Sequence, residues 1–212
     1  IPIQNIYYML SYAFQVLNEQ GYKNIATEQF NNTGELMAAI LEKGIAIQIK
    51  RGLGKEYIPQ TEALSSLRGK IDIAESIKTQ SMLRKQLICT YDEFSVNSIM
   101  NRIIKSTVEL LLRSNISKQR KKNLRKLMVY FSEVDFIDLY TVNWNVQYNR
   151  NNQTYRMLIS ICYLVVKGLL QTQSNGHTKL MDFLDEQRMC RLYEKFILEY
   201  YRREFKNQIT AN

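Results

Sequence analysis

Residues that break regular structure are scarce in this chain. Its 212 residues include only two prolines, Pro2 and Pro59, and only eight glycines. So few turn-forming residues favour long helices over a fold of many short strands. Hydrophobic residues make up 45% of the chain and charged residues 23%, which is enough apolar material for a real core. The composition therefore predicts a mainly helical fold, and the strand candidates described below make the predicted class α+β.

Cysteine and histidine are also rare. The three cysteines, Cys89, Cys162 and Cys190, are odd in number and far apart, which argues against a disulfide framework or a zinc site. We expect reduced, buried thiols in a cytoplasmic protein. The single histidine, His177, follows an Asn-Gly pair and is expected in an exposed turn. It offers neither a metal cluster nor a Ser-His-Asp arrangement.

Long apolar runs and catalytic motifs are missing as well. The longest apolar run, Met157–Val166, is too short to cross a bilayer and predicts a buried helix. The Gly52–Lys55 stretch lacks the spacing and the hydroxyl of a phosphate-binding loop. The acid-x-lysine pattern of PD-(D/E)xK nucleases occurs once, at Glu204–Lys206, on a predicted helix without a strand pair. We therefore expect no catalytic, cofactor or metal site in these residues.

Acidic residues are absent between Leu110 and Ser132, where seven basic residues carry most of the net charge of +9. These residues are Arg113, Lys118, Arg120, Lys121, Lys122, Arg125 and Lys126. Cations without acids cannot pair with one another, so the cluster predicts an anionic or acidic partner. A nucleic-acid backbone and an acidic cavity of another protein both fit, and a plain solvated helix face is the third alternative. The lack of aromatic residues between Leu110 and Val129 disfavours single-strand stacking.

Hydrophobic spacing predicts several helices. Their ranges are Asn5–Gln20, Asn97–Ser114, Lys118–Phe131, Thr154–Leu170 and Gln187–Lys206. The second and third of these are joined by a short loop, so we expect a protruding antiparallel helical hairpin. The basic cluster would then occupy its tip and the outer face of its second helix. The last two helices are expected to pack together.

A small sheet or partial barrel is predicted before the hairpin. Strand candidates cover Lys55–Leu67 and Leu87–Phe94, with a tight turn at Arg68–Lys70. A further helix begins at Gly34, and after Gly44 either a continued helix or a strand fits the alternation of isoleucines. We divide the chain into an α+β region over 1–95, a hairpin stalk over 96–135 and a helical region over 136–212.

Short blocks spread along the whole chain carry a resemblance. They are Ile1–Ala13, Arg51–Leu53, the run Tyr57, Pro59, Thr61 and Glu62, then Arg68–Ile71, Asn101–Thr107, Leu192–Phe196 and Arg202–Glu204. Each block is weak by itself. Together and in this order they resemble the McrC family, the partner subunits of modified-cytosine (5-methylcytosine) restriction systems.

The resemblance implies a subunit of a type IV restriction endonuclease that acts in phage defence. In that family a helical stalk enters the channel of McrB, a hexameric AAA+ GTPase, and GTP hydrolysis is stimulated. A C-terminal PD-(D/E)xK nuclease, which needs Mg²⁺, cuts DNA. The chain starts at Ile1 without methionine and ends at Asn212, so we expect the coupling part without the nuclease, with GTP bound by the partner. The seven cations would contact the McrB channel. The alternative is a DNA-backbone-binding domain that uses the same hairpin.

Overall fold

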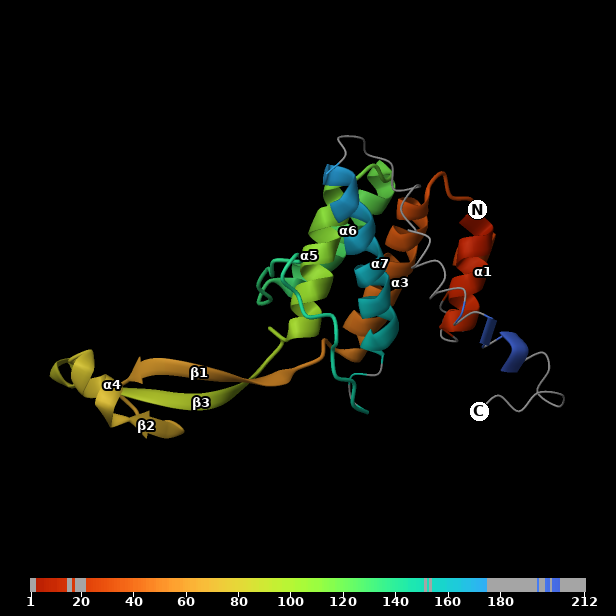
Figure 1. The fold of residues 1–212 in the computed structure, drawn as a ribbon. Coiled ribbons are helices and arrows are strands. Elements are labelled where there is room, and N and C mark those ends of the chain that lie inside the picture. Colours follow the sequence, from red (N-terminus) through yellow and green to blue (C-terminus); the bar gives the residue numbers. More distant parts are fainter. Residues whose placement is uncertain are drawn as a thin grey trace.

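A computed structural model of the chain describes residues 3–14, 17, 22–150, 152, 154–174, 194, 197–198 and 200–202. These residues form a body of helices and a three-stranded arm that extends from one end of it (Figure 1). The body contains α1 (Ile3–Ala13), α2 (Lys23–Thr27), α3 (Thr33–Arg51), α5 (Ile99–Arg113), α6 (Lys118–Met128), η3 (Val129–Phe131) and α7 (Tyr155–Ser174). The arm contains β1 (Glu56–Leu64), β2 (Lys70–Asp72), α4 (Ile73–Lys78), η2 (Ser81–Arg84) and β3 (Leu87–Ser95). The predicted α+β, mainly helical fold with a small sheet is confirmed.

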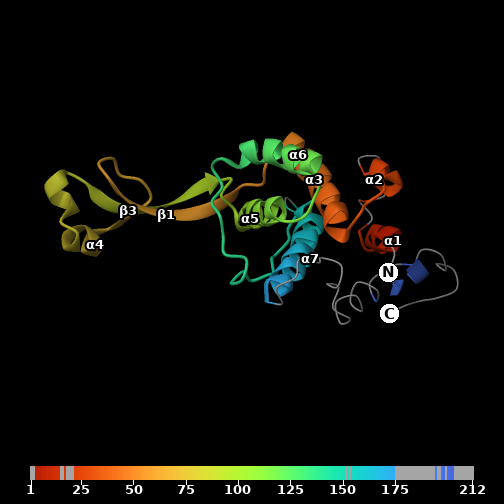
Figure 2. The ribbon, with the colours of Figure 1, turned by 90° about the horizontal axis from the view of Figure 1, so that it is seen from above.

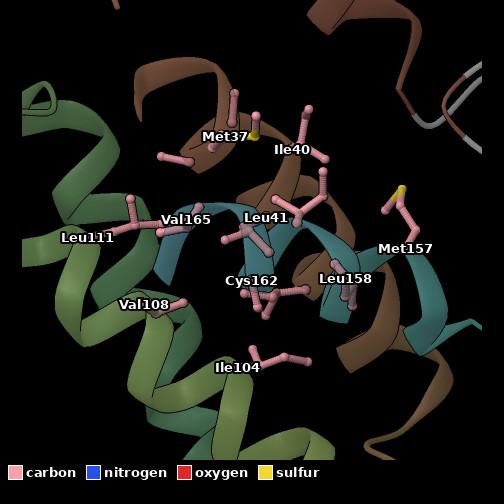
Figure 3. Close-up of a cluster of buried hydrophobic side chains, with 14 of the residues drawn as sticks. Met37, Ile40, Leu41, Ile104, Val108, Leu111, Met157, Leu158, Cys162 and Val165 are labelled. Atoms are coloured by element: carbon pink, nitrogen blue, oxygen red, sulfur yellow. The ribbon is translucent and has the colours of Figure 1, made fainter. Parts of the chain in front are cut away.

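The core lies where α3, α5 and α7 pack against one another (Figure 3). Leu41 of α3, Ile104 of α5 and Cys162 of α7 are completely buried there. The apolar stripe of each helix faces the other two, which is the arrangement that periodic hydrophobic residues favour. The run Met157–Val166 is therefore a buried helix segment, as predicted. No helix in the described ranges is long and apolar enough to span a membrane.

Helix α3 resolves the ambiguity that the sequence left after Gly44. The helix continues to Arg51, because Ile45 is completely buried in the core and tertiary packing outweighs the strand preference of alternating isoleucines. Gly44 lets α7 approach closely, since a Cβ at this position would lie 2.4 Å from Leu158 Cδ2. The helix ends at Gly52, whose φ of 92° suits glycine.

The structure differs from the sequence prediction in the part of the chain that protrudes. Helices α5 and α6 do form consecutive helices joined by a short loop, but α6 lies alongside α3 on the body (Figure 2). Leu124 of α6 and Phe131 just after it are buried in the same core cluster. Burial of these side chains holds α6 against the body, so the helical hairpin does not protrude. The sheet projects from the body instead (Figure 1).

The arm is an antiparallel sheet with the strand order β1-β3-β2. Glu56 pairs with Ser95 at the body end and Leu64 with Leu87 at the far end, so β1 and β3 pair along their full length. The short β2 joins the other edge of β3, with Lys70 opposite Thr90. Both predicted strands are confirmed, and the sheet is open and small.

The helix over Gln187–Lys206 lies largely outside the described residues, and His177, Cys190 and the Glu204–Lys206 pattern lie entirely outside them. Cys89 and Cys162 are free and buried, as predicted. Buried residues from all three predicted regions belong to one core cluster, and the division of the chain into regions stays a prediction.

Candidate functional site

The root of the arm is fixed by two buried side chains. Asn101 of α5 donates from Nδ2 to the carbonyl oxygens of Gly54, at 2.9 Å, and Val96, at 2.8 Å. Gly54 precedes β1 and Val96 follows β3, so one amide group holds both connections between arm and body. Tyr155 of α7 completes this root network, because its hydroxyl accepts from the Gly54 amide and donates to Asn101 Oδ1, each at 2.7 Å. A fully satisfied buried network of this kind sets a single geometry.

Burial raises the pKa of Tyr155, although its hydrogen bonds with Gly54 and Asn101 act in the opposite direction. The phenol therefore stays protonated and can donate to Asn101 at all ordinary pH values. The root network is for this reason insensitive to pH in the physiological range.

The turn after β1 packs against β3. Gly69 has a φ of 68°, and a Cβ added there would lie 2.4 Å from the carbonyl oxygen of Thr90. This close approach places the Arg68 guanidinium 3.9 Å from the centre of the Tyr91 ring, within cation–π range. The Tyr91 hydroxyl in turn donates to Glu62 on β1, at 3.3 Å. The turn is thus a packed part of the arm.

The tip of the arm exposes large apolar side chains next to cations. Its apolar side chains are 53–81% exposed, and they are Leu67, Ile73, Ile77, Met82 and Leu83. We call these five residues the tip patch. Lys70, Lys78 and Arg84 are exposed among them. A concentration of exposed apolar residues with charges around it is typical of an interaction surface.

The tip is ordered although much of its surface is apolar. Ser76 of α4 is completely buried, donates to the Asp72 carbonyl at 2.6 Å and accepts from the Ile88 amide at 2.8 Å. Asp72 also caps α4 by accepting from the Glu75 amide. Sequence reasoning missed the tip patch. The available signal was a segment, 67–85, in which apolar and basic residues alternate without a period that would bury one face.

The predicted basic cluster is divided by the structure. Arg120 points inward, and its side chain is only 14% exposed. It forms ion pairs with three glutamates, and these are Glu28, Glu35 (3.6 Å) and Glu42 (2.9 Å). Burial opposes the charge of Arg120, but the hydrogen bond to Glu42 and the three carboxylates outweigh it and raise its pKa. Arg113 belongs to α5 and pairs there with Glu109 at 3.0 Å.

The five remaining cations lie on the outside of α6. Four are exposed and Lys121 is partly exposed, and no carboxylate of the described residues comes within 4.0 Å of any of them. We call this set the basic face, which consists of Lys118, Lys121, Lys122, Arg125 and Lys126. The seven predicted residues therefore form one cationic surface and two ion-paired positions.

Within the described part of the chain, no group of three or more histidine, cysteine or acidic side chains could hold a metal ion. The observed geometry offers rigid binding surfaces: an arm with an apolar tip and a helix with a cationic outer face.

The family described as "McrBC 5-methylcytosine restriction system component" matches residues 4–212. The chain belongs to this family. The resemblance to McrC subunits is thereby confirmed, and the chain is a component of an McrBC restriction system.

The chain is 30% identical over 214 residues to the "Type IV methyl-directed restriction enzyme EcoKMcrBC" of Escherichia coli (strain K12), covering 100% of this chain and 62% of that protein. Among solved structures it is similar to a chain of the Thermococcus gammatolerans McrBC complex, with a TM-score of 0.62, 21% identity and coverage of 100% and 60% of the two chains. A refined half-complex of T. gammatolerans McrB AAA+ hexamers with bound McrC gives a TM-score of 0.59, 20% identity and coverage of 91% and 46%. These structures share the fold. The chain spans less than two thirds of the length of each of these proteins.

Proposed function

We propose that this chain is the partner-binding part of an McrC-like subunit, and that its arm enters the channel of a hexameric McrB-like AAA+ GTPase. The single observation that carries the proposal is the projecting arm with its exposed tip patch (Figure 1). The similar T. gammatolerans assembly, which contains McrB AAA+ hexamers with bound McrC, supports this choice of partner.

The arm has the shape that insertion into a ring requires. Strands β1 and β3 have nine residues each, so the arm extends about 30 Å at ~3.4 Å per residue. The sheet is only three strands wide, or about 10 Å between the outer strands at ~4.8 Å per strand. The helical hairpin that the sequence favoured lacks this shape, because α6 packs along α3.

Binding at the tip accounts for stimulation of GTP hydrolysis as an equilibrium effect. Apolar side chains such as Ile77 and Leu83 lose contact with water when they enter the ring, and cations such as Arg84 orient the approach. A ring conformation that binds the tip more tightly and is better ordered for catalysis then becomes more populated. GTP and its Mg²⁺ are bound by the partner. DNA cleavage is the task of a PD-(D/E)xK nuclease region that uses Mg²⁺, and hydrolysis in the ring is coupled to it through this chain.

The test uses the full subunit with its GTPase partner. Because Ile73, Ile77 and Leu83 are exposed, the variant Ile73→Ser/Ile77→Ser/Leu83→Ser should fold normally and reduce stimulation of GTP hydrolysis at least tenfold. The matched variant Lys121→Glu/Lys122→Glu/Arg125→Glu changes the predicted hairpin contacts instead, and we expect it to keep stimulation. Full stimulation by the tip variant would show that the arm has another role. Loss of stimulation only in the charge-reversed variant would show that the partner contacts α6.

A further inference from the structure

The basic face of α6 is a surface that partner binding through the arm does not use. Arg120 anchors the helix to α3 with its inward side chain, and Asn123 adds a hydrogen bond to Glu42 at 2.9 Å. The helix is therefore held in one orientation, with Lys118, Lys122 and Arg125 directed to solvent. Fixed cations lose less conformational freedom on binding than cations on a flexible segment.

The charge of this surface is not cancelled by the nearby acids. Arg120 neutralises one of the three carboxylates that surround it, which leaves two negative charges beside five cations and a local balance of +3. The side chains of Glu35 and Glu42 are only 13% and 21% exposed and lie against Arg120, whereas Glu28 is 44% exposed.

The composition of the basic face identifies its partner by chemistry. From Lys118 to Lys126 the outward side chains are cationic or polar, and the single apolar residue, Leu124, is completely buried. Protein interfaces have an apolar centre, which this face lacks, whereas contacts to phosphate oxygens need only cations and hydrogen-bond donors. The absence of an aromatic side chain there disfavours single strands, which bind by base stacking.

We propose that the basic face binds the phosphate backbone of duplex DNA without reading its sequence. Helix α6 has 11 residues and extends about 16 Å at ~1.5 Å per residue. Over that length one strand of duplex DNA presents about five phosphates, which suits the five cations of the face. The arm projects from the body away from α6 (Figure 1), so both surfaces can be occupied together.

The experiment is a titration of the full chain against a fluorescein-labelled 20-base-pair unmodified duplex, followed by anisotropy between 50 and 200 mM salt. We expect log K to fall with log salt with a slope of about −4.5, because each of the five phosphate contacts contributes ~0.9. The variant Lys122→Glu/Arg125→Glu/Lys126→Glu should bind at least tenfold more weakly and lose about three units of slope.

A control with the same change in net charge separates a site from a general charge effect. The variant Lys70→Glu/Lys78→Glu/Arg84→Glu reverses three exposed cations on the arm, and we expect it to bind the duplex like the parent chain. Equal losses of DNA affinity in both variants would mean that only the net charge matters. Unchanged DNA affinity of the α6 variant would show that the basic face is not the binding site. If the α6 variant bound DNA normally but lost binding to the GTPase ring, the basic face would be a protein contact and the proposal would fail. Circular dichroism and thermal unfolding establish that each variant is folded.

Discussion

Tyr155 donates its hydroxyl hydrogen to Oδ1 of Asn101 across a distance of 2.7 Å, and this bond joins α7 to α5 at the root of the arm. Asn101 is completely buried and binds both connections between the body and the sheet, at Gly54 before β1 and at Val96 after β3. The direction in which the arm leaves the body therefore depends on two side chains of the body. If a bound partner displaced the arm, this network would resist the movement and transmit the force to α5 and α7.

Removal of the Tyr155 hydroxyl should loosen the arm. In Tyr155→Phe the Gly54 amide loses its acceptor and Asn101 Oδ1 loses its donor, so we expect a loss of about 1–3 kcal/mol in the free energy of unfolding. Urea unfolding measures the loss, and amide hydrogen exchange at residues 54–57 should accelerate. Tyr163→Phe makes the same chemical change on the half-buried side of α7 and should have little effect. Equal stability of both variants would mean that the root network does not fix the arm.

Alanine at Gly69 should destabilise the arm and spare the body. The φ of 68° costs an alanine about 1–2 kcal/mol, and its Cβ would also collide with the Thr90 carbonyl. We expect faster hydrogen exchange in β2 and β3 and weaker stimulation of the GTPase, with unchanged exchange in α5 and α7. Gly52→Ala is the comparison, because Gly52 has a φ of 92° but no atom within 4 Å of the added Cβ. A larger loss at Gly52 than at Gly69 would contradict the role of the close contact.

The helices of the body were largely predictable because their apolar residues repeat with a helical period. The segment Asn97–Ser114 is observed as α5 over Ile99–Arg113, with its N-cap at Ser98. The extension of α3 was ambiguous because isoleucines at alternate positions also suit a strand, and only burial against the body decides between the two. The two long strands were predictable from the sequence pattern. Their projection into solvent depends on long-range pairing that periodicity does not encode.

The inward orientation of Arg120 shows why the basic cluster could not be resolved from sequence. Its three glutamate partners lie on α3 or just before it and are far away along the chain. Glu42 is 78 residues from Arg120, and Glu28 is 92 residues from it. One local signal did exist, because Arg120 precedes the buried Leu124 by four residues and so shares its helix face. The outward direction of Lys122 and Arg125 follows from the same helical spacing.

Loss of the Arg120 charge should weaken the attachment of α6 to α3. In Arg120→Leu three carboxylates remain close together without their counter-ion, and we expect a loss of about 2–4 kcal/mol in the free energy of unfolding. The added substitutions Glu35→Gln and Glu42→Gln should restore part of it, which chemical denaturation can measure. Arg125→Leu, on the basic face, should change stability by less than about 0.5 kcal/mol. A stability for Arg120→Leu equal to that of Arg125→Leu would show that the ion pairs contribute nothing.

Cys162 gives the protein a dependence on alkaline pH. Complete burial raises the pKa of its thiol from 9.0 to about 12, although a hydrogen bond with Thr107 acts in the opposite direction. Between these two values the unfolded chain has released the thiol proton while the folded chain still holds it. The unfolded state therefore binds fewer protons, and the stability contributed by the neutral thiol is lost as the pH rises above about 9.

For this one group the free energy of unfolding should fall by about 1.4 kcal/mol per pH unit once the unfolded thiol is ionised. Urea unfolding of the parent chain and of Cys162→Ala between pH 8 and 10.5 isolates the contribution, because other alkaline titrations, such as that of Tyr155, are common to both. The variant should show the shallower decline, whatever its stability at pH 8, since alanine carries no proton to lose. The same burial should keep Cys162 unreactive toward a thiol reagent at pH 8 until the chain unfolds. Parallel declines in the two proteins would mean that the thiol ionises as readily in the folded state as in the unfolded one, and the core between α5 and α7 would then admit water.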